Sequence, residues 1–92
     1  MVSLPTRFID VDDTSLAYDR CGSGPSVVLL HAGLGDRRMW DDQVEPFAEH
    51  FDVIRLDARG FGESLRTEAP YRSAGDVLAV MDALEVERAS LI

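Results

Sequence analysis

Two short segments contain the residues whose types and spacing could do chemistry. His31–Asp36 places Gly33 and Gly35 around one leucine, directly after an aliphatic run. Asp57–Ser64 is also interrupted by glycines and carries charged and hydroxyl side chains. Backbone N–H groups in a glycine turn are free to point at an anion. The first segment therefore predicts either a phosphate cradle or an oxyanion hole, in which an N–H stabilises the negative oxygen of a reaction intermediate.

The stretches that precede these segments are predicted to be buried strands. Ser26–Leu30 is aliphatic without polar alternation, which is typical of a strand covered on both faces of a parallel sheet. Phe51–Asp57 is mostly apolar around Asp52 and Arg55, and we interpret it as a second buried parallel strand. Loops at the carboxyl ends of parallel strands are where α/β folds place their chemistry.

Further strands are expected at the two ends of the chain. Thr6–Val11 and Ser15–Asp19 contain β-branched and aromatic residues and predict an antiparallel hairpin that turns at Asp12–Thr14. Ala89–Ile92 is apolar and predicts a last strand.

The first predicted helix covers Asp36–His50, where apolar residues recur at helical spacing. Asp36 is the expected N-cap. Pro46 is expected to bend or break this helix, or to mark the first turn of a second short helix that starts near Asp42.

The second predicted helix begins with a capping box formed by Ser73 and Asp76. Its buried face is predicted from helical spacing to contain Ala74, Val77, Leu78, Met81 and Leu84. The helix is expected to end near Glu85, where a glycine is absent, so its C-cap is non-glycine or strained by up to about 1 kcal/mol.

The order of these elements predicts an α/β fold. A mostly parallel sheet is opened by an antiparallel hairpin, and helices cover both of its faces. Ninety-two residues are enough for one small domain, so no second domain is expected.

Composition narrows the possible partners and the compartment. A net charge of −8 argues against nucleic acid, which is bound by clustered basic residues. The single cysteine, Cys21, cannot form an internal disulfide and fits a reducing cytoplasm. No apolar run approaches the length of about 20 residues that spans a membrane, so we expect a cytoplasmic protein without membrane contact.

Three features in order resemble the N-terminal third of an α/β-hydrolase. They are the run Leu30–Gly33, then Trp40, then the Asp-x-Arg-Gly-x-Gly-x-Ser loop that starts at Asp57. The resemblance covers about Arg7 to Ile92. It implies a partial α/β-hydrolase fold, in which residues 1–92 are the N-terminal part of one domain. It also implies hydrolysis of a small-molecule ester, lactone or related substrate, with no cofactor and no metal. One departure is Ala32, where the family usually has glycine.

The resemblance assigns a role to each matching residue. The backbone N–H of Gly33 would form half of the oxyanion hole, and Leu34 would line the substrate pocket. The motif histidine of the family is structural, which applies to His31. The remaining matched positions would hold the second loop in shape: Asp57, Arg59, Gly60, Gly62 and Ser64.

The catalytic triad of the family is expected to lie outside this sequence. Ser64 is not the nucleophile, because Arg66 stands where the nucleophile elbow Gly-x-Ser-x-Gly needs its second glycine. The family places that elbow after the strand predicted at Ala89–Ile92. Nucleophile, acid and base are all absent from the matched motifs, so the chain alone is not expected to hydrolyse a substrate by the family mechanism.

The family strand order 1-2-4-3-5 leaves Ala89–Ile92 at the edge of the sheet. An exposed apolar edge strand favours a partner chain, self-association or aggregation.

Two other functions stay open from the sequence. A dinucleotide-binding unit is indicated by Gly33-x-Gly35 after a strand and by Asp57 about 20 residues on, although Arg38 occupies the third glycine position. The other is a non-catalytic association module.

Overall fold

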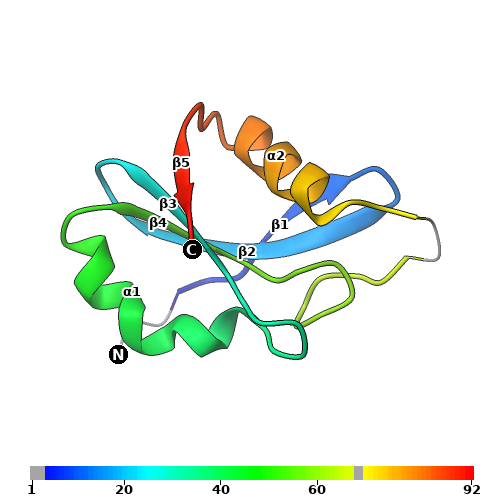
Figure 1. Cartoon of the computed structure of the whole chain (residues 1–92), viewed down its shortest axis with the longest axis horizontal. Helices are drawn as coiled ribbons and strands as arrows, with labels where there is room; N and C mark the ends of the chain where they lie inside the picture. The colour runs from blue at the N-terminus through cyan, green and yellow to red at the C-terminus, as the bar shows by residue number, and fades with distance from the viewer. Residues whose placement is uncertain (1–3, 68–69) are drawn as a thin grey trace.

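The computed structural model describes residues 4–67 and 70–92 and contains one five-stranded sheet with two α-helices and a 3-10 turn (Figure 1). The elements are β1 Arg7–Val11, β2 Thr14–Gly22, β3 Ser26–Leu30, η1 Arg37–Trp40, α1 Asp41–Ala48, β4 Asp52–Leu56, α2 Ser73–Ala83 and β5 Ala89–Leu91. No helix in the described ranges is long and apolar enough to cross a membrane.

The strand order is β1-β2-β4-β3-β5, as the family resemblance predicts. β3 pairs in parallel with both β4 and β5, while β2 pairs antiparallel with both β1 and β4. The α/β fold class is confirmed, and the sheet is evenly mixed because the hairpin also joins β4 in the antiparallel sense. β5 lies at one edge, and its hydrogen bonding to β3 extends to Ile92.

The aliphatic strands are buried on both faces, because a helix packs against each side of the sheet (Figure 1). In β3, Val28 contributes to the core under α2, while Val27 and Leu29 pack toward Trp40 and α1. Successive side chains of a strand point to opposite faces, so a continuous aliphatic run is what two covered faces require.

The hairpin is tighter and longer than predicted. Val11 pairs with Thr14, so the turn is Asp12 and Asp13 alone, with Asp12 at φ +52°. β2 does not stop at Asp19, because its second half pairs with β4 as far as Gly22.

Of the two alternatives predicted for Asp36–His50, one continuous helix is wrong, whereas a second short helix that starts near Asp42 is close to what the structure contains. Asp36 is a cap as expected, and its side chain accepts a hydrogen bond from the Arg38 N–H, but the helix it caps is the short turn η1. α1 then starts at Asp41 as a separate helix. Pro46 lies beyond the first turn of α1 and does not end it, so it removes one helical hydrogen bond without breaking the helix.

The start of α2 also differs from the prediction. Ser73 is the first helical residue, and the N-cap Arg72 makes no side-chain cap bond, so there is no capping box. The Asp76 carboxylate is buried and bonded to Arg59. Of the predicted buried face, Val77 is buried and Met81 and Leu84 are half-buried, but Ala74 is exposed and Leu78 is 60% exposed; Val80 is buried instead.

The end of α2 contains the non-glycine cap that the sequence predicts. Glu85 has φ +59°, its N–H donates to Asp82, and the Val86 N–H donates to Met81 at 2.8 Å. This is a Schellman motif with glutamate at the left-handed position that favours glycine.

Candidate functional site

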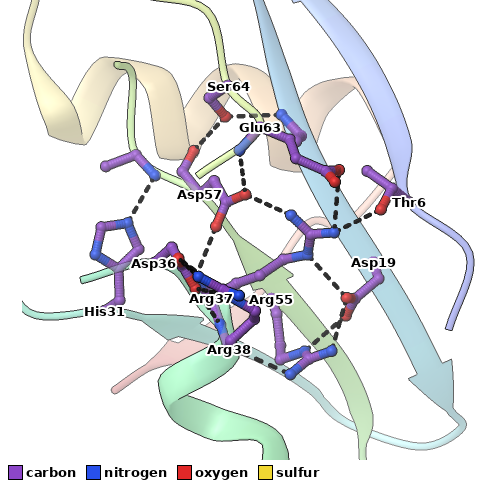
Figure 2. A network of polar contacts seen from close by, with 12 residues as sticks. Thr6, Asp19, His31, Asp36, Arg37, Arg38, Arg55, Asp57, Glu63 and Ser64 are labelled. Atoms are coloured by element: carbon purple, nitrogen blue, oxygen red, sulfur yellow. Dashed lines mark hydrogen bonds and ion pairs between the residues drawn. The ribbon is translucent and has the colours of Figure 1, made fainter. Parts of the chain in front are cut away.

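The two glycine-containing segments lie side by side at one end of the sheet. They follow β3 and β4, which are parallel neighbours with Leu30 paired to Leu56 at their carboxyl ends. Figure 2 shows this region. We call residues 31–36 the β3 loop and residues 57–64 the β4 loop.

The centre of the β3 loop is a turn that exposes Gly33. The Gly35 N–H donates to the Ala32 carbonyl at 2.9 Å and closes the turn. A Cβ on Gly33 would meet no atom within 4 Å, and Gly33 lines a cavity of about 850 Å³ between the sheet and α2. Among the described residues, none accepts a hydrogen bond from the Gly33 N–H. This backbone donor can therefore be offered to a ligand.

Leu34 is 99% exposed and does not line this cavity. Its predicted place in a substrate pocket stays a prediction.

His31 uses both ring nitrogens to hold backbone. Its Nε2 accepts a hydrogen bond from the Ala58 N–H at 2.9 Å, and its Nδ1 lies 2.7 Å from the Ala32 carbonyl. Because a backbone amide only donates, Nε2 is the unprotonated nitrogen and Nδ1 carries the proton. The ring also packs edge-on against Phe61, with 5.7 Å between centroids. In this arrangement His31 joins the two loops and has no nitrogen free to act as a base.

Asp57 is the acceptor around which the β4 loop folds. Its side chain is only 1% exposed and accepts hydrogen bonds from the Arg37 N–H at 2.7 Å, the Glu63 N–H at 2.9 Å and the Arg37 guanidinium (Figure 2). Gly62 lies against it with φ +53°, and a Cβ there would collide with the carboxylate.

The remaining motif side chains also hold the β4 loop. The Ser64 hydroxyl accepts from the Ala17 N–H at 2.8 Å and donates to the Asp57 carbonyl at 2.7 Å. Arg59 forms a two-pronged ion pair with Asp76, at 3.0 and 2.6 Å. Gly60 adopts φ +84°, a conformation that favours glycine.

A buried charge network lies beneath the loops and is not among the features predicted from the sequence. Arg37 donates hydrogen bonds to Asp19 at 3.0 Å and to Asp57 (Figure 2). Arg55 donates two hydrogen bonds of 2.8 Å to Asp19 and one of 2.6 Å to Asp41. Burial acts to lower the pKa of Arg37, but the hydrogen bond that Arg37 donates to Asp19 and the charge of Asp57 outweigh burial and raise that pKa. Only the interruption of an aliphatic strand by Arg55 could have signalled the network.

Asp36 closes the β3 loop by capping η1. Hydrogen bonds from the Arg38 side chain and backbone lower the pKa of Asp36 to about 2. The carboxylate is therefore ionised at neutral pH and holds the end of the loop.

Other kinds of site fit this geometry poorly. Within residues 4–67 and 70–92, no group of three or more histidine, cysteine or acidic side chains could hold a metal ion. The dinucleotide interpretation needs Asp57 to reach a ribose, but this carboxylate is buried and bonded to Arg37 and Glu63. What the arrangement can do chemically is offer a backbone N–H to a developing negative charge beside a cavity.

Comparisons with known proteins agree with this geometry. The family model described as alpha/beta hydrolase fold matches residues 25–92. The chain is similar to a hydrolase of known structure from Pseudomonas aeruginosa PA01, with 39% identity and a TM-score of 0.87 over 94% of this chain and 35% of that one. It is also similar to the enol-lactonase from Burkholderia xenovorans LB400, with 36% identity and a TM-score of 0.87 over 92% of this chain and 35% of that one.

A curated relative from Cupriavidus necator is the dihydrolipoyllysine-residue acetyltransferase component of an acetoin cleaving system. It is 33% identical over 90 residues, which are 94% of this chain and 24% of the relative. The chain thus spans between about a quarter and a third of the length of these three proteins. The chain belongs to the α/β-hydrolase fold family.

Proposed function

We propose that this chain supplies half of the oxyanion hole of an enzyme that hydrolyses small esters or lactones. The observation that carries the proposal is the Gly33 turn, whose N–H has no acceptor among the described residues and which opens on the large cavity. A backbone N–H aimed at the oxygen of a tetrahedral intermediate is worth roughly 3 kcal/mol of transition-state stabilisation. The similarity to an enol-lactonase favours a lactone or ester.

We further propose that the nucleophile, the acid and the base are supplied outside residues 1–92. The sequence contains no Gly-x-Ser-x-Gly motif. The three motif residues of suitable type are His31, Asp57 and Ser64. All three are already bonded: His31 to backbone through both nitrogens, Asp57 to Arg37 and the Glu63 N–H, and Ser64 to Ala17 and Asp57. Without the triad, the oxyanion hole and substrate binding leave only a small residual part of the catalysis.

The test is a substrate panel with the complete protein that contains this chain, and with the chain alone as the control. We expect hydrolysis of p-nitrophenyl acetate or of a γ-lactone by the complete protein, and none by the chain alone. Turnover of only an epoxide or a haloalkane would show that the substrate class is one of these and not an ester or lactone. Tight binding of NADH without any hydrolysis would overturn the proposal in favour of a dinucleotide site.

A second role, association through β5, is favoured by the exposed edge of the sheet. Leu91 and Ile92 are 54% and 52% exposed, and β3 is the only described strand with which β5 pairs. We propose that a further strand, from a partner chain or a second copy, pairs with this edge. Sedimentation of the purified chain should reveal self-association, or a partner chain should co-purify with it. A monomer that unfolds cooperatively with high stability in urea would contradict this role.

A further inference from the structure

The segment that carries Gly33 is tied to the β4 loop at both ends. At its beginning, the Ala58 N–H donates to His31 Nε2 at 2.9 Å. Just past its end, the Arg37 N–H donates to Asp57 at 2.7 Å. Figure 2 shows the dashed lines that reach His31 and Asp57. The position of the Gly33 N–H therefore depends on two anchors in the neighbouring loop.

The two anchors differ in their response to protons. The Arg37 anchor is an ion pair as well as a backbone bond, since the guanidinium also contacts the Asp57 carboxylate. The His31 anchor exists only while Nε2 has a free lone pair. A proton added to Nε2 from solvent makes it a donor that faces the Ala58 N–H, another donor, while Nδ1–H keeps its contact with the Ala32 carbonyl.

We propose that His31 is a positioning residue that holds the Gly33 turn only while its imidazole is neutral, so that proton binding releases this end of the turn. The inference rests on the oxyanion role proposed above for Gly33. Acidification would then weaken catalysis through the shape of the β3 loop, separately from any proton transfer by a catalytic base.

Most of the charged groups around His31 form ion pairs with one another. On its own loop, Asp36 is bonded to Arg38. On the β4 loop Asp57 is paired with Arg37, and across the cavity that His31 lines Asp76 is paired with Arg59. Two further charged residues line the same cavity: Glu87 and Arg88. Asp36, Asp57 and Asp76 are therefore paired with arginines, and Asp36 also interacts electrostatically with His31.

The test is amide hydrogen exchange of the ¹⁵N-labelled chain by NMR between pH 8 and pH 5, expressed as protection factors. The Ala58 protection factor should fall about tenfold on acidification, which is what the loss of one hydrogen bond produces. The Glu63 N–H is an internal control, because it donates to Asp57 at 2.9 Å and should keep its protection.

Two variants separate His31 from the other histidine of the chain, the exposed His50. His31→Gln places an oxygen that accepts but does not titrate near the position of Nε2, so Ala58 protection should become independent of pH. His50→Gln should behave as the wild type. Constant Ala58 protection from pH 8 to pH 5, or a pH dependence that persists in His31→Gln, would overturn the inference.

The comparison of wild type with His50→Gln still decides the matter where His31→Gln does not fold. The readout needs no substrate. Absence of ester hydrolysis together with pH-dependent release of Ala58 would therefore overturn the oxyanion role alone.

Discussion

Substitution of Gly62 by alanine should be among the most damaging glycine changes in the chain. Gly62 has φ +53°, and its Cβ would collide with the buried Asp57 carboxylate. The left-handed conformation costs alanine about 1 kcal/mol. Displacing the carboxylate weakens its charge-assisted bonds to Arg37 and Glu63, each worth about 1.5–3 kcal/mol. We expect Gly62→Ala to lower the free energy of unfolding by about 3–5 kcal/mol.

Two other glycines of the same loops are matched controls in urea unfolding of the complete protein that contains this chain, followed by circular dichroism. Gly60→Ala also takes a positive φ, +84°, but its nearest neighbour is the flexible Arg66 side chain at 3.6 Å, so about 1 kcal/mol should be lost. Gly33→Ala meets nothing within 4 Å and should change the free energy by less than about 0.5 kcal/mol. If Gly62→Ala is no worse than Gly60→Ala, the packing of the β4 loop around Asp57 is wrong.

Three further predictions concern stability. Glu85→Gly should raise the free energy of unfolding by about 1 kcal/mol in urea, because residue 85 has φ +59° at a helix C-terminus, and a loss of stability would contradict the Schellman motif. Asp19→Asn should cost about 3 kcal/mol in the same assay, because Arg37 and Arg55 share this buried carboxylate, and a neutral result would refute the network.

The third of these predictions is a pH dependence. Burial opposes ionisation of Asp52, but hydrogen bonds from Arg20 and Ser26 outweigh it and lower its pKa. A lowered folded-state pKa contributes stability above the unfolded pKa of about 3.9 and loses it as pH falls through the folded value. Stability measured between pH 5 and pH 2 should therefore fall less in Asp52→Asn than in the wild type, and equal slopes would contradict the pairing.

The strands and their order follow from the sequence because period and burial decide them. The aliphatic run of β3 requires two covered faces, and the structure supplies a helix on each. The end of α2 can also be predicted from the sequence, because the absence of glycine near Glu85 leaves few ways to end the helix.

The boundaries that failed depend on tertiary contacts. Asp76 suits a capping box by its spacing from Ser73, yet in the fold its carboxylate meets Arg59 from the β4 loop. The helix predicted from Asp36 is interrupted because Arg37 turns inward to Asp19 and Asp57. Pairings of this kind join residues far apart in the chain, and no local pattern contains them.

The central claim is that the Gly33 N–H stabilises a developing oxyanion, and the kinetics of the complete protein test it most directly. Gly33 is not among the glycines with positive φ, so Gly33→Pro removes the N–H without requiring a left-handed residue, and Gly33→Ala keeps it. With a p-nitrophenyl ester, the account predicts that kcat of Gly33→Pro falls by about 10²–10³-fold relative to Gly33→Ala, with little change in KM. Equal kcat values for two folded variants would contradict it.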